Sequence, residues 1–368
     1  MPAGNIDAIF AKLDERISMD ELNAAATGAS SQQIGEAKTI AGSTTDKEYR
    51  RLVANGNCTS FSKLATLHSC PRLYELEQLK ANSKAAQLEP ETVNLDFAFG
   101  HSVGAGIQTY GATKNLVAAQ WAAFLSWRAP WDAEAFDKRD IPKYKSLTWA
   151  LYAVEKFAWF MEQELSDWEV LRLPNSNKPA VELSFGIDCG NGYFHFGHID
   201  AVLQHKETKK IAVWEGKTTT FESVEDAVYG NSYQALGYSV VLDALADQLS
   251  FPGSDYEVFY IVYSSKAREF TLLPFTKNKT QRAEWLQDML LSHATLDTYK
   301  QLQFFPKRGD NCINKYGRKC QWYGQCHMKN SSLLPGVEVG QVASMEQVES
   351  VDFKFSIAEL VAAQKKGA

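Results

Sequence analysis

The sequence predicts an α/β protein in which a mixed β-sheet is flanked by helices. Apolar and aromatic residues at helical spacing predict helices at 61–80, 97–127 and 146–167. The period then changes, because residues 180–188 and 193–204 alternate in polarity and are rich in β-branched and aromatic residues. A chain that passes from helices to strands and back again is typical of a sheet covered by helices.

Later elements extend this sheet and its cover. A third strand is predicted at 210–215, after a glycine turn at 190–192 and a polar turn at 207–209. A helix is expected at 231–247. The remaining predicted elements are strands at 256–263 and 268–273 and a long helix at 278–303.

The length of 368 residues suits two domains of about 150 residues or one large domain with insertions. Small polar residues predict a flexible arm at 1–45, and the segment 331–368 is expected to form a C-terminal tail with a terminal helix. The domain itself is assigned to 46–330, with a helical part at about 97–167, a sheet core at about 178–275 and a cysteine cluster at 312–326.

Composition limits the class of protein. The net charge of −6 disfavours binding of nucleic acid through bulk charge, although a local basic groove remains compatible with it. No run approaches the roughly 18 apolar residues that span a bilayer, so no membrane partner is expected. The N-terminal stretch lacks a basic segment followed by an apolar one, which predicts a cytoplasmic location. Six cysteines in such a chain are expected to be thiols that bind metal, act as nucleophiles or fill the core.

Two acidic residues and a lysine fall on neighbouring predicted strands. Asp200 lies in one strand, and Glu215 and Lys217 project from one face of the next, because side chains alternate along a strand. Two carboxylates, with the carbonyl of Gly216, suit Mg²⁺ or Mn²⁺. The alternative is an exposed strand end with a chance Glu-x-Lys, but the apolar residues before both acids favour a buried site, where unpaired charge would be costly.

A second candidate metal site is formed by cysteines. Cys312, Cys320 and Cys326 are clustered among aromatic and glycine residues, and thiolates are soft ligands for iron–sulfur clusters or Zn²⁺. Lysine and arginine side chains are interleaved with aromatic rings in this segment, which suits either contact with nucleic acid or a solvated loop around a structural metal.

The residues around the acids resemble motifs of a known family. The runs 197–200 and 213–218 resemble motifs II and III of the RecB-like branch of the PD-(D/E)XK nucleases, and Gln234 with Tyr238 resembles the Q-x-x-x-Y motif of that branch. The resemblance implies a restriction-endonuclease-like fold with a helical insertion. It also implies hydrolysis of DNA with Mg²⁺ or Mn²⁺ held by Asp200 and Glu215.

In relatives, residues such as Lys217 assist the attacking water, and residues such as Gln234 and Tyr238 support the site and contact the DNA backbone. The resemblance therefore assigns these roles here. Glu182 lies where relatives often carry an acidic residue, and it is a further candidate ligand.

The chain departs from the family at one motif. A helix bearing G-x-x-x-H usually supplies a metal-binding histidine, but Gly104 stands at the expected position here. His101, one turn earlier on the predicted helix, is a candidate substitute. His198 is the other candidate, because it shares a strand face with Asp200.

The cysteines extend the resemblance to the iron–sulfur members of the branch, such as the AddB-type and CRISPR-adaptation nucleases. These members place one cysteine far upstream of a late three-cysteine cluster, and a 4Fe-4S cluster joins the two ends of the domain. The resemblance implies Cys70, Cys312, Cys320 and Cys326 as ligands. Seven residues between Cys312 and Cys320 are more than many relatives have, so a tetrathiolate Zn²⁺ site is the alternative.

Gly216, Lys217 and Thr218 mimic the end of a phosphate-binding P-loop, but Ile211 stands where that loop needs a glycine, so no nucleotide cofactor is expected. The resulting hypothesis is a metal-dependent DNA exonuclease of recombination, repair or phage genome processing, with recombination or replication proteins as further partners. A phage gene, acting in the host cytoplasm, fits by analogy. The alternatives are a silent DNA-binding scaffold and a structure-specific endonuclease.

Overall fold

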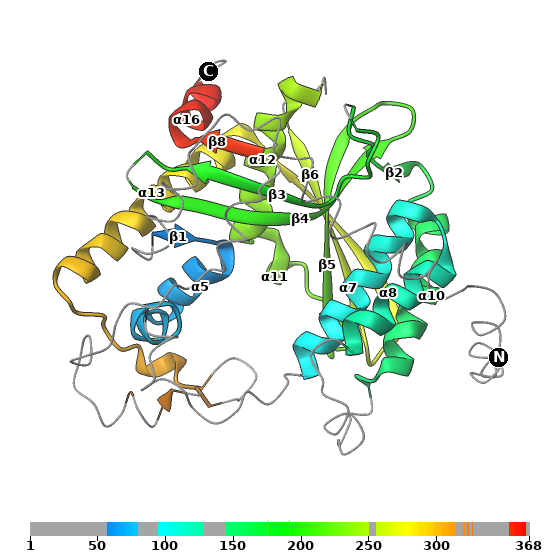
Figure 1. Ribbon diagram of the computed structural model, residues 1–368, viewed down its shortest axis with the longest axis horizontal. Helices are drawn as coiled ribbons and strands as arrows, with labels where there is room; N and C mark the ends of the chain where they lie inside the picture. The colour runs from blue at the N-terminus through cyan, green and yellow to red at the C-terminus, as the bar shows by residue number, and fades with distance from the viewer. Residues whose placement is uncertain are drawn as a thin grey trace.

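A computed structural model of the protein describes residues 57–79, 95–128, 144–249 without 175 and 191, 255–313, 319–320, 322–323, 326 and 353–365. The predicted arm at 1–45 lies outside these residues, as does the segment 327–352. The described strands form one eight-stranded sheet with the main order β7-β6-β5-β4-β3-β8 (Figure 1).

The sheet is mixed, as the sequence predicts. Its central strands are β3 (Val181–Asp188), β4 (Phe194–His205), β5 (Ile211–Thr219), β6 (Tyr256–Ser264) and β7 (Glu269–Lys277). Antiparallel pairs join β3 to β4, β4 to β5 and β6 to β7, whereas β5 and β6 are parallel. Three short strands complete it: β1 (Cys58–Thr59) and β2 (Trp168–Val170) pair with β4, and β8 (Phe353–Ser356) pairs with β3.

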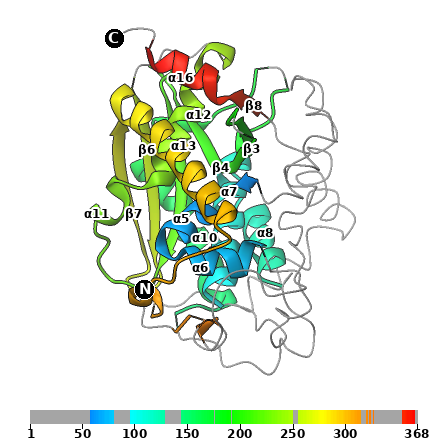
Figure 2. The ribbon, with the colours of Figure 1, turned by 90° about the vertical axis from the view of Figure 1, so that its left-hand side faces the viewer.

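Helices cover both faces of the sheet (Figures 1 and 2). Alternate residues of β5 divide between two cores, because side chains reverse along a strand. Val213 belongs to the core under α5 (Phe61–Ser69), α12 (Tyr233–Leu249), α13 (Lys279–Gln301) and α16 (Ile357–Lys365). Trp214 belongs to the core under α7 (Leu95–Thr113), α8 (Leu116–Arg128) and α10 (Leu147–Glu164).

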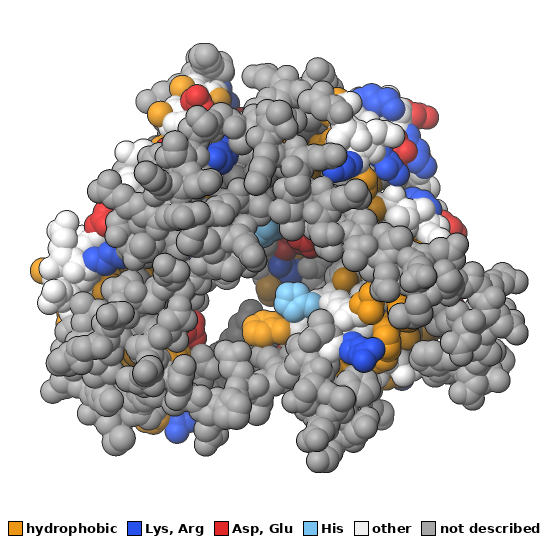
Figure 3. All heavy atoms as spheres, viewed as in Figure 1, with side chains coloured by type: hydrophobic (Ala, Val, Ile, Leu, Met, Phe, Trp, Pro, Cys, Tyr) orange, Lys and Arg blue, Asp and Glu red, His pale blue; other side chains and the backbone are white. Residues whose placement is uncertain are grey.

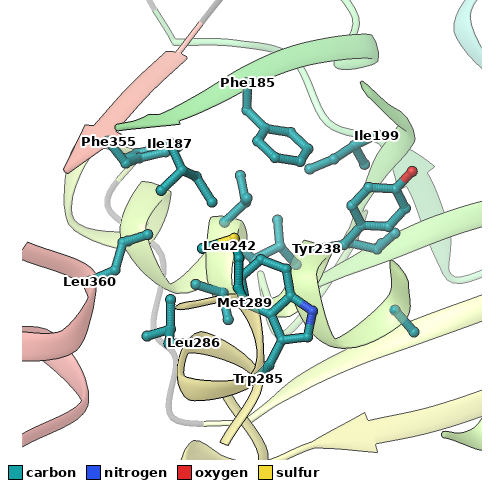
Figure 4. Packing of buried hydrophobic residues seen from close by; sticks show 14 of the residues in the cluster. Phe185, Ile187, Ile199, Tyr238, Leu242, Trp285, Leu286, Met289, Phe355 and Leu360 are labelled. Atoms are coloured by element: carbon teal, nitrogen blue, oxygen red, sulfur yellow. The ribbon is translucent and has the colours of Figure 1, made fainter. Parts of the chain in front are cut away.

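The first core joins the C-terminal part of the chain to the sheet. Phe185 and Ile187 of β3 and Phe355 of β8 lie opposite Leu242 of α12 and Trp285 of α13 (Figure 4). Burying a side chain of this size contributes about 1.5–3 kcal/mol. We expected residues 331–368 to form a C-terminal tail with a terminal helix, and α16 is such a helix. The part at 353–365 packs on this core, and its short strand carries too few residues to show a period.

Two predicted helices are interrupted. The helix expected at 61–80 divides because Cys70 has an extended backbone (φ −155°) before Pro71, which disfavours helical geometry in the residue ahead of it. A short helix α6 (Pro71–Tyr74) and a single π-turn (Glu75–Leu79) follow. The helix expected at 97–127 divides into α7 and α8 at Lys114, whose φ is +56°.

A small helix, α11 (Ala227–Gly230), follows β5. None of the helices in the described parts of the chain is long and apolar enough to cross a membrane.

The sheet divides at β4 and β5, and this division positions the candidate site. The two strands pair only where 201–204 of β4 oppose 211–214 of β5. Beyond that point the first half of β4 pairs with β3, whereas β5 continues beside β6. Figure 1 shows β4 leading toward β8 while β5 continues in another direction. Asp200 and Glu215 are the first residues beyond the paired segment, one on each strand.

Candidate active site

The two acids and the lysine lie at the division between β4 and β5. Because β4 has turned away from β5 at this point, a side chain bonds to the backbone N–H of Gly216: Oδ2 of Asp200 accepts this bond at 2.8 Å. On β5, the buried Glu215 accepts a hydrogen bond through Oε1 from Nζ of Lys217, with which it forms an ion pair. The strands thus bring Asp200, Glu215 and Lys217 together, as their spacing predicts.

The helix α12 adds two polar residues to this group. Nζ of Lys217 donates to Oε1 of Gln234 at 3.1 Å, and Nε2 of Gln234 donates to the hydroxyl of Tyr238 at 2.6 Å. The Tyr238 hydroxyl donates to the carbonyl of His198 on β4 at 2.6 Å. This chain of hydrogen bonds connects β5, α12 and β4, so the amide and the phenol hold the lysine and both strands in place.

Burial dominates the electrostatics of the acids. Burial raises the pKa of Asp200 well above its usual value, and the negative charges of Glu215 and Glu182 raise it further. Burial also raises the pKa of Glu215, against the opposing effects of Lys217 and Tyr238. Burial lowers the pKa of Lys217, but the charges of Glu215 and Asp200 raise it overall, so the ammonium keeps its proton. Among the described residues, the site therefore holds more acid than Lys217 neutralises.

The acidic side chains offer ligands for a divalent cation. Glu215 is only 1% exposed, and its Oε2 has no hydrogen-bond partner among the described residues. An unpaired oxygen of this kind is costly unless a proton or a cation meets it. Two adjacent carboxylates, one with such an oxygen, fit Mg²⁺ or Mn²⁺ chemically. The described residues contain no group of three or more His, Cys, Asp or Glu side chains that could hold a metal ion, so the pair is an incomplete shell that water would finish.

Glu182 lies across from Asp200. Val181 and Leu183, its neighbours on β3, pair with Ala201 and Ile199, which places Glu182 opposite Asp200. Its backbone has a φ of +50°, a strained conformation for this residue type, and such strain is concentrated at functional sites. Oε1 of Glu182 accepts a hydrogen bond of 2.6 Å from Nε2 of Gln108 on α7. No motif in the sequence singles out Gln108, because its role depends on how α7 packs.

The structure does not gather the candidate histidines with both acids. His101 is exposed on α7, and His198 is exposed on β4 with its carbonyl bonded to Tyr238. A side chain at Gly104 would meet nothing within 4 Å, so the family's usual histidine position faces open space here. His101 and His198 thus stay predictions as metal ligands.

The four cysteines line one cavity. Cys70, Cys312, Cys320 and Cys326 all border a space of about 150 Å³, together with the basic residues Arg72, Lys307 and Arg308. Burial raises the pKa of the Cys326 thiol, whereas the charges of Lys307 and Arg72 lower it. The thiols are not gathered tightly enough to count as a metal site among the described residues, but their common cavity joins segments that are far apart in the chain.

A pair of carboxylates, of which Glu215 is buried and Asp200 is half-buried, lies beside a lysine at the division of a mixed sheet and defines a candidate hydrolytic site of the metal-dependent kind. The model of the PD-(D/E)XK nuclease superfamily matches residues 59–327, well over half of the sequence. The chain belongs to this superfamily, so it is classed with nucleases, hydrolases that act on DNA.

Among solved structures, the chain is similar to one described as "Putative exonuclease" from Eubacterium rectale. The identity is 10% and the TM-score is 0.42, over 80% of this chain and 97% of the other. No curated protein matches the sequence.

Proposed function

We propose that the protein is a Mg²⁺- or Mn²⁺-dependent DNA exonuclease whose catalytic centre is the pair of Asp200 and Glu215 with Lys217. The observation that carries the proposal is the buried Oε2 of Glu215, which lacks a hydrogen-bond partner among the described residues and lies beside a carboxyl group of raised pKa. A divalent cation bound by both carboxylates would offset the repulsion between their negative charges.

Each residue has a distinct role in this proposal. Asp200, Glu215 and the carbonyl of Gly216 would hold the ion, which lowers the pKa of a bound water and neutralises charge on the phosphate. Lys217, whose ammonium pairs with Glu215, donates a hydrogen bond to the phosphate or the attacking water. Gln234 positions Lys217 through their 3.1 Å hydrogen bond, and Tyr238 holds Gln234.

We further propose that Cys70, Cys312, Cys320 and Cys326 hold a 4Fe-4S cluster. The supporting observation is the cavity of about 150 Å³ between them, since a space for one water-sized occupant needs only about 10–15 Å³. The guanidinium of Arg72 and the ammonium of Lys307 would offset the negative charge of the thiolates.

The test of catalysis is degradation of linear DNA labelled at the 5′ or the 3′ end, with Mn²⁺, by the wild type and Lys217→Ala. Lys206→Ala, in the turn between β4 and β5, is a matched control. Wild type and control should shorten the DNA while Lys217→Ala does not. Release of nucleotides from labelled ends, with covalently closed circles left intact, would identify an exonuclease. Cleavage of circles would identify an endonuclease, and failure of the wild type with every metal and DNA form would favour the DNA-binding scaffold.

The test of the cluster is the colour and metal content of anaerobically purified protein. Thiolate-bound iron gives a brown protein with broad absorbance near ~400 nm. A colourless protein with one zinc per chain would show that the four cysteines bind Zn²⁺ instead of a cluster. This result would leave the catalytic proposal unaffected. Recombination or replication proteins and a cytoplasmic location remain part of the proposed setting.

A further inference from the structure

Gln108 is the residue of α7 that contacts an acidic side chain next to the carboxylate pair of Asp200 and Glu215. Its Nε2 donates a hydrogen bond of 2.6 Å to Oε1 of Glu182 on β3. A hydrogen bond to a carboxylate is shorter and stronger than one between neutral groups, because the charge assists it. The bond therefore gives Glu182 a defined orientation, provided that Gln108 itself is held in place.

The position of Gln108 is fixed by the close packing of α7 on β5. A Cβ at Gly216 would lie 3.1 Å from the side chain of Ile107, the residue before Gln108. A Cβ at Gly111, three residues after Gln108, would lie 2.6 Å from the ring of Trp214. Contacts this close leave the helix no room to shift, because packed interiors tolerate little change of volume. The amide of Gln108 therefore stays at one place relative to β5.

Glu182 lies where β3 and β4 both change the core that they face. Val181 packs against the core under α7, whereas Leu183 belongs to the core under α12. Their partners on β4, Ala201 and Ile199, divide between the two cores in the same way. Residues two apart on a regular strand share a face, so the strand turns over at Glu182, whose φ is +50°. The backbone thus sets where this acid begins, and the bond from α7 sets where it points.

Glu182 interacts with both acids of the carboxylate pair. Its negative charge raises the pKa of Asp200 and the pKa of Glu215. Among the described residues, the one ion pair of these three acids joins Glu215 to Lys217. The buried Oε2 of Glu215 also lacks a hydrogen-bond partner there. A divalent cation would relieve the repulsion and would meet this oxygen.

The group is open on the side of α7. Gly104 lies one turn before Gln108 on the same face of the helix, and a Cβ there would meet nothing within 4 Å. The side chain of Glu182 is itself exposed. Figure 3 shows a hollow in one face of the molecule, with acidic, basic and histidine side chains visible in it. Mg²⁺ keeps several waters when carboxylates bind it, so an open side suits an ion with a partly hydrated shell.

We infer that Gln108 is a positioning residue, whose amide holds Glu182 so that this carboxylate accepts a hydrogen bond from water bound to the cation. The inference rests on the proposed function, because it concerns the cation that the carboxylate pair would hold. Glu182 then acts through water and not as a third direct ligand. This role agrees with the described residues, which contain no group of three acidic, histidine or cysteine side chains that could hold a metal ion.

The inference is tested by titrating the full chain with Mn²⁺ in the absence of DNA, after divalent cations have been removed with a chelator. Free Mn²⁺ gives an EPR signal that is lost on binding, so the titration reports affinity without catalysis. Gln108→Met keeps the length of the side chain but cannot donate, and it should weaken Mn²⁺ binding about tenfold, as expected when a hydrogen bond behind a metal shell is lost. Glu182→Gln should weaken binding by at least as much, because it removes the charged acceptor.

The double variant separates positioning from a direct effect. Gln108 acts only through Glu182, so adding Gln108→Met to Glu182→Gln should leave the Mn²⁺ affinity of Glu182→Gln unchanged. Gln163→Met is the matched control, because Gln163 is an exposed glutamine of α10, a helix that carries none of the candidate site residues. The control should bind Mn²⁺ as the wild type does.

Thermal unfolding distinguishes this role from a structural one. In a chelator, Gln108→Met should unfold close to the wild-type temperature, and added Mn²⁺ should stabilise it less than the wild type. A variant that loses the same stability with and without Mn²⁺ would assign Gln108 to the docking of α7 alone. Wild-type Mn²⁺ affinity of Gln108→Met would overturn the inference, and so would an equal loss of affinity whether or not Glu182 is present.

The proposed function fails separately from this inference. A wild type that binds Mn²⁺ with the expected coupling but cuts no DNA with any metal would refute hydrolysis and leave the role of Gln108 in place. A wild type that cuts DNA while Gln108→Met binds Mn²⁺ equally well would refute the positioning role alone. Absence of Mn²⁺ binding by the wild type would overturn both.

Discussion

The carboxylate site and the cysteine cavity differ in how the chain holds them together. Asp200 and Glu215 lie on strands whose pairing sets their positions, and hydrogen bonds from Gly216 and Lys217 orient them. The four cysteines come from segments far apart in the sequence and border an open cavity. The comparison teaches that strand pairing alone positions the two carboxylates, whereas a cluster bound by the four cysteines, as proposed, would join segments that lie far apart in the sequence.

The largest expected effect comes from removing the Lys217 ammonium from the carboxylate site. Lys217→Ala should lower kcat for DNA hydrolysis by about 10²–10⁴-fold, because it removes the charged donor nearest the two acids. Steady-state hydrolysis of an end-labelled oligonucleotide measures the loss. Gln234→Ala should lower kcat less, since Gln234 acts only through Lys217. Equal activity of Lys217→Ala and the wild type would remove the lysine from the mechanism.

The second prediction concerns the cysteine cavity. Cys326→Ser should abolish metal binding in the cysteine cavity and lower the free energy of unfolding by several kcal/mol. This loss is smaller than the roughly 10 kcal/mol that metal contributes to small zinc domains, because the sheet core remains. Metal analysis and thermal unfolding measure the two effects. Cys189→Ala is the control, since Cys189 is buried in the core beside β3 and should leave the metal content unchanged. Unaltered metal content in Cys326→Ser would exclude this thiol as a ligand.

The third prediction concerns the joint between the two regions. Thr59 of β1, near the segment that carries Cys70, bonds through its hydroxyl to His195 Nδ1 of β4 at 3.2 Å and to His293 Nε2 of α13 at 3.0 Å. Burial and the charge of His293 lower the pKa of His195 to about 3. Burial and the charge of Lys300 lower the pKa of His293 to about 4.

Both histidines stay neutral in the fold but gain protons at pH 6.5 when unfolded, so the stability they confer is full above pH 6.5 and falls as the pH drops toward 4. Each contributes a slope of up to about 1.4 kcal/mol per pH unit. In His293→Gln the free energy of unfolding should therefore fall less steeply between pH 6 and about pH 4.5. The exposed His101→Gln serves as the control, and parallel curves for wild type and His293→Gln would contradict the assignment.

The smallest expected effect is a change in the free energy of unfolding when the charge of Asp200 is removed. Asp200→Asn removes a half-buried acid that interacts unfavourably with Glu215 and Glu182, so the metal-free protein should gain about 1 kcal/mol in unfolding free energy. Adding Mn²⁺ should stabilise the wild type but not the variant. Thermal unfolding in a chelator and then in Mn²⁺ measures both, and destabilisation of the variant in the chelator would show that Asp200 is structural.

Much of the fold could be predicted because apolar residues recur along each central strand or helix with the spacing typical of that element. The strands around Asp200 and Glu215 and the long helix after β7 appear within a few residues of their predicted bounds. The spacing of the two acids was informative because only one turn separates their strands.

The other features could not be predicted, because they depend on how distant elements pack, and no local sequence pattern indicates this packing. The division between β4 and β5 arises from the course of the whole sheet, so the bond from Gly216 to Asp200 has no sequence signal. Gln108 acquires its place from how α7 packs on β5.

The pairing of β8 with β3 has a consequence for synthesis. Phe353 of β8 lies parallel beside Phe185 of β3, and β8 is made after every other described strand. Before β8 is made, the strands that carry Asp200 and Glu215 can already pair, but β3 keeps an open edge onto which another nascent chain could add. Pairing of residues 353–356 with β3 closes that edge, so the interval before this pairing is when β3 is most exposed to aggregation.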